Sequence, residues 1–226
     1  MVWPAVISSG FGRTGRRVPD NRKSWLAIAG TILVSLWLAT TTGRAFESNY
    51  TSISEKHCRK FNVEKINGSE YAASRVCAGR GGYKVFIDEV DLRETLTVGR
   101  TMRQARKEPA ARDSYGPFNG YDDRIEWRSG ADGRPYALIV GWFFDDNDNI
   151  DATGRPSSAR LLVVMRLPPG PVCRVANIDR AANSDANELA RGAADEIARD
   201  FKCGTDSVRV IGKRGAAIEA LARQAQ

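Results

Sequence analysis

The sequence contains a single histidine, His57, in 226 residues. A Ser-His-Asp or Cys-His catalytic arrangement needs a histidine as its base, so one such arrangement at most is possible here. No Gly-x-Ser-x-Gly elbow supports it. His57 also precedes Cys58, which we expect to be disulfide-bonded. The sequence therefore does not indicate histidine-dependent hydrolysis.

Close cysteine pairs are also missing. The four cysteines, Cys58, Cys77, Cys173 and Cys203, include no C-x-x-C pair, whereas zinc sites usually show close ligand pairs. Disulfide bonds in an oxidising compartment are the better interpretation, and we predict no metal and no cofactor. Three pairings are possible. We favour Cys58 with Cys77 and Cys173 with Cys203, because each bond would tie an irregular or helical segment to a neighbouring strand.

The main part of the chain has no large excess of positive charge. The net charge is +7, but residues 1–45 hold six of the 34 basic residues and one of the 27 acidic residues. The remaining 181 residues therefore carry an excess of only +2. Without a basic surface of substantial charge, we do not expect nucleic acid as a partner.

The glycine-rich stretch "CAGRGGYKVF", residues 77–86, lacks the features of a phosphate-binding loop. A dinucleotide fingerprint needs a third glycine where Lys84 stands, and the stretch leads into a strand rather than a helix. There is no Walker lysine. Gly79, Gly81 and Gly82 instead predict a sharp turn between a disulfide at Cys77 and a strand that begins at Tyr83.

One uncharged run is present near the N-terminus, at residues 24–43, with basic residues before it and Gly43-Arg44-Ala45 after it. This layout is typical of a secretory signal peptide, and we favour cleavage after Ala45. The run is also long enough for an uncleaved transmembrane anchor in the inner membrane. In both cases residues 46–226, which we expect to be a single domain, are exported.

Several strands follow in the exported part. Alternation predicts strands from Tyr83 and over 94–99, and residues 124–145 predict a hairpin whose second strand is central and covered on both faces. Further strands are expected at 160–167, 171–178 and 208–212. Residues 50–76 are polar and predict loop with short strands.

The periodicity becomes helical in "NSDANELARGAADEIARDFKCG", residues 183–204, where Leu189, Ala193 and Ile197 recur every four positions. A marginal helix is expected over 215–225. We therefore predict an α+β fold with a mainly antiparallel sheet of about six strands, one major helix packed on it and a short C-terminal helix.

Two parts of the exported domain carry a resemblance. "CAGRGGYKVF" followed by "DLRETLTVG" resembles a set of uncharacterised exported proteins of alphaproteobacteria that share a Cys-x-Gly-x-x-Gly-Tyr pattern and then Asp-Leu-Arg. "CRVANIDRAANSDANELARGAADEIARDFKC" is similar to the corresponding part of those proteins. The resemblance implies a periplasmic setting and a shared cysteine framework, and it implies no activity and no catalytic residues.

The strongest candidate binding region covers residues 100–121. Its basic part predicts a short helix, and its Gly- and Pro-rich part carries aromatic residues that either form a binding surface or fold back onto the core. The alternative for the basic part is a solvated loop. The candidate binding residues are Arg100, Arg103, Arg106, Lys107, Tyr115, Phe118 and Tyr121.

Two acidic features are candidate sites. Asp145, Asn147, Asn149 and Asp151 alternate, but an EF-hand would need Gly and Glu where Ile150 and Pro156 stand, so a solvated loop is favoured.

A carboxylate pair such as Asp88 with Glu89 or Asp91 could hydrolyse a glycoside. The exported part holds 26 acidic residues, however, so such pairs are expected by chance and do not by themselves indicate an enzyme. The sequence therefore predicts a non-enzymatic periplasmic or secreted protein that binds an envelope polymer or a periplasmic protein, with an inhibitor of a cell-wall hydrolase as one version. A cell-envelope hydrolase with paired carboxylates is the alternative.

Overall fold

The computed structural model describes residues 46–113 and 118–224. The segment 1–45, interpreted as a signal peptide or membrane anchor, lies outside the described residues. Within those two ranges, no helix is both long enough and apolar enough to span a membrane.

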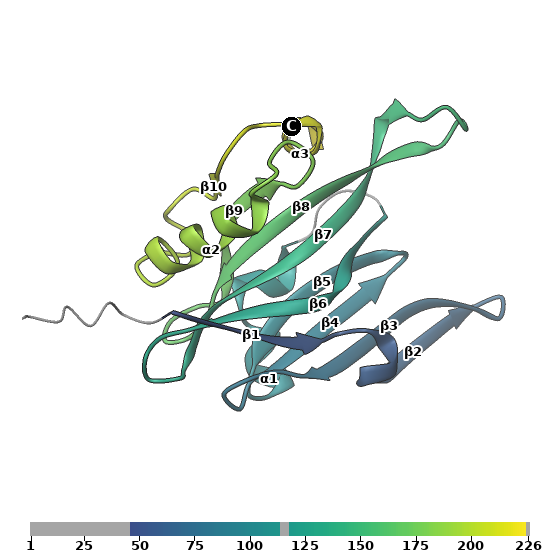
Figure 1. The fold of residues 1–226 in the computed structure, drawn as a ribbon. Coiled ribbons are helices and arrows are strands. Elements are labelled where there is room, and N and C mark those ends of the chain that lie inside the picture. The colour runs from purple at the N-terminus through teal and green to yellow at the C-terminus, as the bar shows by residue number, and fades with distance from the viewer. Residues whose placement is uncertain (1–45, 114–117, 225–226) are drawn as a thin grey trace, which may run out of the picture. The chain divides into compact units, whose positions relative to one another are not determined.

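The described chain is dominated by one mixed sheet of ten strands, not by the predicted sheet of about six strands with one major helix (Figure 1). The strands are β1 Glu47–Ser52, β2 Cys58–Ile66, β3 Ser69–Ala78, β4 Lys84–Val90, β5 Arg93–Gly99, β6 Asn119–Ser129, β7 Pro135–Ile150, β8 Pro156–Arg166, β9 Cys173–Asp179 and β10 Arg209–Val210. The helices are small: α1 Met102–Ala105, α2 Ala186–Glu196 and α3 Ala216–Gln224, with 3-10 turns η1 Glu55–His57 and η2 Pro109–Arg112.

The hairpin of β2 and β3 replaces the predicted loop over 50–76. Most β2 side chains are exposed on both faces, so the strand lacks the apolar alternation by which a half-buried strand is found in sequence. Asn67 and Gly68 form its turn with φ angles of 51° and 83°, as a tight hairpin turn requires.

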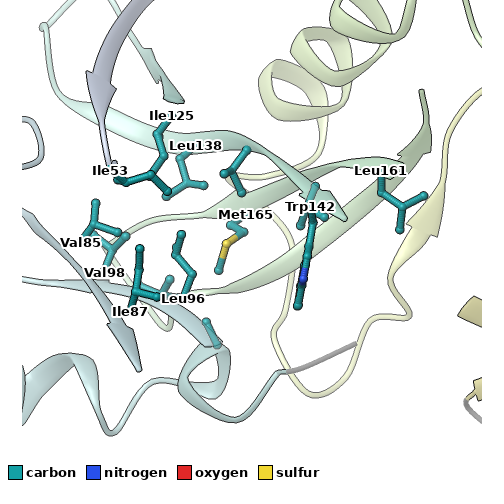
Figure 2. Packing of buried hydrophobic residues seen from close by; sticks show 14 of the residues in the cluster. Ile53, Val85, Ile87, Leu96, Val98, Ile125, Leu138, Trp142, Leu161 and Met165 are labelled. Carbon is teal, nitrogen blue, oxygen red and sulfur yellow. The ribbon is translucent and has the colours of Figure 1, made fainter. Parts of the chain in front are cut away.

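The sheet folds over to form two facing layers. β2 to β5 form one antiparallel meander and β6 to β9 form another, and in the described chain β5 pairs with β6 at Arg93 and Asn119 alone. Val85 of β4 and Leu96 of β5 belong to the same buried cluster as Leu138 and Met165 of the other layer (Figure 2). The first hydrophobic core therefore lies between the two meanders.

β7 is central, as predicted, and is buried on both faces from Pro135 to Trp142. Leu138 and Val140 belong to the first core. Ala137 and Ile139 belong to a second core, which α2 covers with small side chains such as Ala190 and Ala194. The prediction that this helix packs on the sheet is thus confirmed, but the helix ends at Glu196, before the predicted end near Gly204.

Two disulfide bonds brace the described chain, Cys58–Cys77 and Cys173–Cys203, in the pairing favoured from sequence. Cys58 and Cys77 are direct partners in the β2–β3 ladder, so this bond joins two neighbouring strands rather than an irregular segment to a strand. Cys173 begins β9, and Cys203 follows α2. Disulfide bonds of this kind persist in oxidising compartments, which indicates an extracytoplasmic location.

Candidate functional site

Turns at one end of the sheet enclose an open cleft of about 1060 Å³. The β6–β7 and β8–β9 turns lie at the same end because they are alternate turns of one antiparallel meander. The β3–β4 turn of the other meander also lines the cleft. The cleft is lined by four arginines, two tyrosines and one aspartate among other residues, and we call it the arginine cleft. These seven side chains are Arg100, Arg134, Arg166, Arg199, Tyr83, Tyr136 and Asp132.

Two of the arginines stack on tyrosines that belong to different layers. The Arg100 guanidinium carbon lies 4.9 Å from the ring centroid of Tyr83, and that of Arg199 lies 3.9 Å from the ring centroid of Tyr136. Both distances are within the range of cation–π interactions. The rings thus support two cationic groups that line one cleft.

The other two arginines lie in turns. Arg166 donates hydrogen bonds to the carbonyl oxygens of Phe201 and, at 2.6 Å, Pro169, and so ties the β8–β9 turn to the segment after α2. Arg134 is exposed in the β6–β7 turn. In the described ranges, Nε of Arg166 and Nε of Arg199 are buried without a hydrogen-bond partner.

The cleft is cationic because its arginines lack acidic partners. No carboxylate of the described residues forms a salt bridge with any of the four, although arginines elsewhere in the fold are paired in this way. Asp132 is the one acidic residue in the described lining, and its Oδ1 accepts a hydrogen bond of 3.1 Å from the backbone N–H of Arg134. Guanidinium groups that have no carboxylate partner are suited to bidentate binding of a phosphate or carboxylate group of a ligand.

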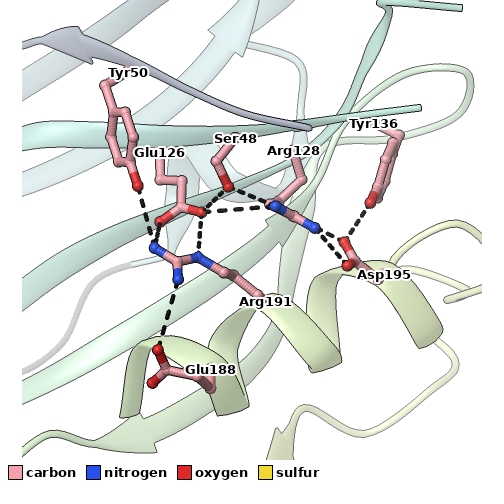
Figure 3. Close-up of polar contacts among 8 residues, drawn as sticks. All are labelled: Ser48, Tyr50, Glu126, Arg128, Tyr136, Glu188, Arg191 and Asp195. Atoms are coloured by element: carbon pink, nitrogen blue, oxygen red, sulfur yellow. Dashed lines mark hydrogen bonds and ion pairs between the residues drawn. The ribbon is translucent and has the colours of Figure 1, made fainter. Parts of the chain in front are cut away.

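A polar network behind the cleft joins β1, β6 and β7 to α2 (Figure 3). Arg128 donates two hydrogen bonds to Asp195, at 2.9 and 2.6 Å. The Tyr136 hydroxyl also donates to Asp195. Tyr136 therefore belongs both to this network and to the cleft, and α2 holds Asp195 one turn before Arg199.

Burial and hydrogen bonding set the charge states in this network. Burial raises the pKa of Tyr136, and its hydrogen bond to Asp195 raises the pKa further, so the phenol stays neutral. Burial also tends to raise the pKa of Glu126, but hydrogen bonds from Arg191 and Ser48 outweigh it and lower the pKa. The network is thus a set of satisfied charges that positions the helix.

The predicted basic residues are only partly brought together. Arg100 precedes α1 and lines the arginine cleft. Three of the predicted basic residues are exposed on α1 or just after it, namely Arg103, Arg106 and Lys107. Nη2 of Arg106 lies 3.7 Å from Oδ1 of Asp88. None of these three is among the cleft-lining residues of the described chain.

The predicted aromatic residues do not form one surface. Tyr115 lies outside the described residues. Phe118 is 44% exposed near the start of β6, which is the end of the sheet opposite to the cleft. Tyr121 folds back instead, with its ring 4.8 Å from that of Trp142, and burial raises its pKa.

The glycine-rich stretch forms the predicted turn, and this turn lines the cleft. Gly81 and Gly82 have φ angles of 62° and 80°, and the Tyr83 N–H donates a 3.0 Å hydrogen bond to the Arg80 carbonyl. A Cβ atom on Gly82 would lie 2.5 Å from Nη1 of Arg100. Glycine here leaves space for the guanidinium.

The acidic run from Asp145 is not the predicted solvated loop, because β7 continues to Ile150. Arg223 of α3 reaches it and donates to Asp146 at 2.8 Å and to Asp148 at 2.9 Å. Across residues 46–113 and 118–224, no group of three or more His, Cys, Asp or Glu side chains is arranged to hold a metal ion.

The carboxylates considered for hydrolysis do not converge. Asp88 accepts a 2.5 Å hydrogen bond from Ser74, and Glu89, as the next residue in the strand, points to the other face. Asp91 follows β4 and pairs with Arg93 at 2.6 Å. His57 Nδ1 lies 2.8 Å from the hydroxyl of its near neighbour Ser54.

Arg134, Arg166 and Arg199 were missed from sequence because they are far apart along the chain. A signal was nevertheless present. "SGADGR" ends with Arg134 and "RLPPG" begins with Arg166, so each predicted turn at this end carries an arginine. Comparison with protein-family models, curated protein sequences and solved structures finds no significant match.

Proposed function

We propose that this chain is a non-enzymatic binding protein of the periplasm that holds an anionic component of the cell envelope in the arginine cleft. Two disulfide bonds support an oxidising compartment. The resemblance to exported alphaproteobacterial proteins supports the periplasm within that class.

One observation carries the proposal. Four arginines line the same cleft, and none of them has a carboxylate partner among the described residues. Unpaired guanidinium groups repel one another, and an anion relieves this repulsion while accepting several charge-assisted hydrogen bonds. Stacking on Tyr83 and Tyr136 limits the motion of Arg100 and Arg199, so less side-chain entropy is lost when the ligand binds. A phosphate or carboxylate group is the ligand that this chemistry favours.

The ligand enters a concave site rather than meeting a flat surface. The cleft opens between turns that belong to both layers of the sheet, so a protruding anionic group of a polymer, lipid or protein fits it better than a broad surface does. An inhibitor-like role would require the partner to insert such a group.

The test is a titration of the full-length chain, in a non-ionic detergent, with inorganic pyrophosphate and separately with citrate. Calorimetry measures the affinity for each anion. Arg199→Gln and Arg134→Gln should each weaken binding about tenfold, because each removes charge-assisted hydrogen bonds of ~1.5 kcal/mol. Arg155→Gln, in the β7–β8 turn at the opposite end of the sheet, should leave affinity unchanged. Equal affinities for the wild-type chain and the three variants, or no binding of either anion to the wild-type chain, would refute the proposal.

A further inference from the structure

The β7–β8 hairpin projects from the end of the sheet that is opposite to the arginine cleft (Figure 1). Residues 147–155, which form its tip, are all exposed. The stretch "DDNDNIDATGR", residues 145–155, holds four aspartates and one arginine. Arg223 of α3 offsets part of this negative charge, because it pairs with Asp146 and Asp148. The hairpin is therefore a protruding element that keeps an excess of negative charge.

Asp151 is held as an anion at this tip. Its Oδ1 accepts hydrogen bonds from the Thr153 hydroxyl at 2.6 Å and from the backbone N–H groups of Thr153 and Arg155 at 2.7 and 3.1 Å. These hydrogen bonds, that of the Thr153 hydroxyl first, lower the pKa of the carboxyl group. All three use Oδ1, so Oδ2 is left to accept from a guanidinium group of another molecule.

The tip and the arginine cleft are complementary. The tip carries Asp151 and also Asp148, whose side chain is 70% exposed, whereas the four arginines of the cleft have no carboxylate partner among the described residues. Ile150 lies between these aspartates and is 53% exposed, and Leu167 and Pro168 give the cleft apolar lining. A protruding acidic turn is thus the kind of group that the cleft favours.

The hairpin cannot reach the cleft of its own chain. β7 has 16 residues and runs from Pro135, which lines the cleft, to Ile150 at the tip. At 3.3 Å per residue, a strand of this length separates the tip from the cleft by about 50 Å. A tip that occupies a cleft must therefore come from a second copy of the chain.

We propose that the acidic β7–β8 hairpin of one copy occupies the arginine cleft of a second copy when no ligand is bound, so that self-association and ligand binding exclude one another. This inference rests on the proposed function and adds a partner and a form of regulation for the same site. The contact is heterologous, because different surfaces of the two copies meet. A ligand anion that binds the cleft shifts the population towards single copies.

Sedimentation velocity of the full-length chain in a non-ionic detergent measures this association. The wild-type chain should associate, and added salt or saturating inorganic pyrophosphate should dissociate it. Arg199→Gln should weaken association about tenfold, and so should the double variant Asp148→Asn with Asp151→Asn, because each removes charge-assisted hydrogen bonds. Asparagine at position 151 keeps an acceptor oxygen for the turn. Glu64→Gln removes an exposed carboxylate from the β2–β3 hairpin and is the matched control, which should associate like the wild-type chain.

Mixing the two weakened proteins identifies the contact. Arg199→Gln keeps an intact acidic hairpin, and the aspartate double variant keeps an intact cleft. An equimolar mixture should therefore form pairs with the affinity of the wild-type contact, although neither protein does so alone. This recovery occurs only if the hairpin and the cleft contact each other.

Four outcomes overturn the inference. If pyrophosphate binds but the wild-type chain stays monomeric, the anion-binding function stands and the self-association is wrong. If the chain associates but the mixture recovers nothing, or the double variant associates like the wild-type chain, the hairpin is not the occupant of the cleft. If association persists in saturating pyrophosphate, the two events do not compete. If the chain neither binds pyrophosphate nor associates, both proposals fall.

Discussion

Glu126 shows how a single side chain balances burial against hydrogen bonding. It lies on β6 beneath α2 and is 8% exposed, and Arg191 donates to it at 2.7 Å. An ion pair in this position is satisfied rather than strongly stabilising, but removal of one partner leaves the other charge buried and unpaired.

Glu126→Gln should lower the free energy of unfolding by about 2 kcal/mol at pH 7. Because the pKa of Glu126 is lowered in the fold, the stability that its carboxylate contributes is present above the ordinary glutamate pKa and is lost as the pH falls through the folded value. The deficit of the variant should therefore shrink below about pH 4.5. Urea unfolding at pH 7, 5 and 3 measures this.

Glu188→Gln is the matched control. Glu188 also faces Arg191, at 3.8 Å, but its side chain is 70% exposed, so its loss should change stability by less than about 0.5 kcal/mol. A deficit for Glu126→Gln that stays constant from pH 7 to pH 3 would contradict the assignment of the lowered pKa.

At the scale of elements, the apolar strands were predictable and the polar ones were not. β7 and β8 have long apolar runs, whereas β1 reads "ESNYTS" and is half-exposed along its length. Its pairing with β6 depends on contacts that are distant in sequence, such as Ser48 with Glu126. The arginine cleft could be predicted only at Arg100 and its glycine turn, because the other turns approach it through the register of the whole sheet.

The β3–β4 turn allows a test that separates stability from binding. Gly82 and Gly68 both have φ near 80°, so alanine at either position should cost about 1 kcal/mol. A Cβ atom on Gly82 would displace Arg100, whereas one on Gly68 meets no atom within 4 Å. Gly82→Ala should therefore weaken pyrophosphate binding severalfold and Gly68→Ala should not. Equal binding by the two variants would mean that Arg100 does not contact the anion.

The docking of α3 depends on one buried carboxylate. Asp179 at the end of β9 is fully buried and accepts hydrogen bonds of 3.0 Å from the backbone N–H groups of Ala181, Ala182 and Ala217. A fourth N–H, that of Ile218, lies at 3.4 Å.

Asp179→Ala leaves these donors without their acceptor and should lower the free energy of unfolding by about 3 kcal/mol. Asp179→Asn keeps one acceptor oxygen and should lose less. Urea unfolding ranks the three proteins, and amide exchange should accelerate first in α3. Wild-type stability in the alanine variant would show that water replaces the carboxylate.

At the scale of the whole molecule, the two disulfides contribute a large share of the stability expected for such a domain. The cysteines are 19 and 30 positions apart, and each bond contributes about 3 kcal/mol in the chain-entropy model. The total is comparable to the ~5–15 kcal/mol by which domains are usually stable.

Replacing either pair by serine should therefore lower the urea midpoint clearly, and replacing both should bring the domain close to unfolding at 37 °C. Denaturation curves with and without reductant measure the same effect in the wild-type chain. A urea midpoint that does not change with reductant would show that the disulfide bonds do not contribute to the stability of the folded domain.

β7 gives alternate side chains to the two hydrophobic cores, through Leu138 on one side and Ile139 on the other. The two cores therefore share this strand as a common wall, so displacement of β7 from the sheet would expose both cores to water at once. A proteolytic cut within β7 should accordingly destabilise both cores together.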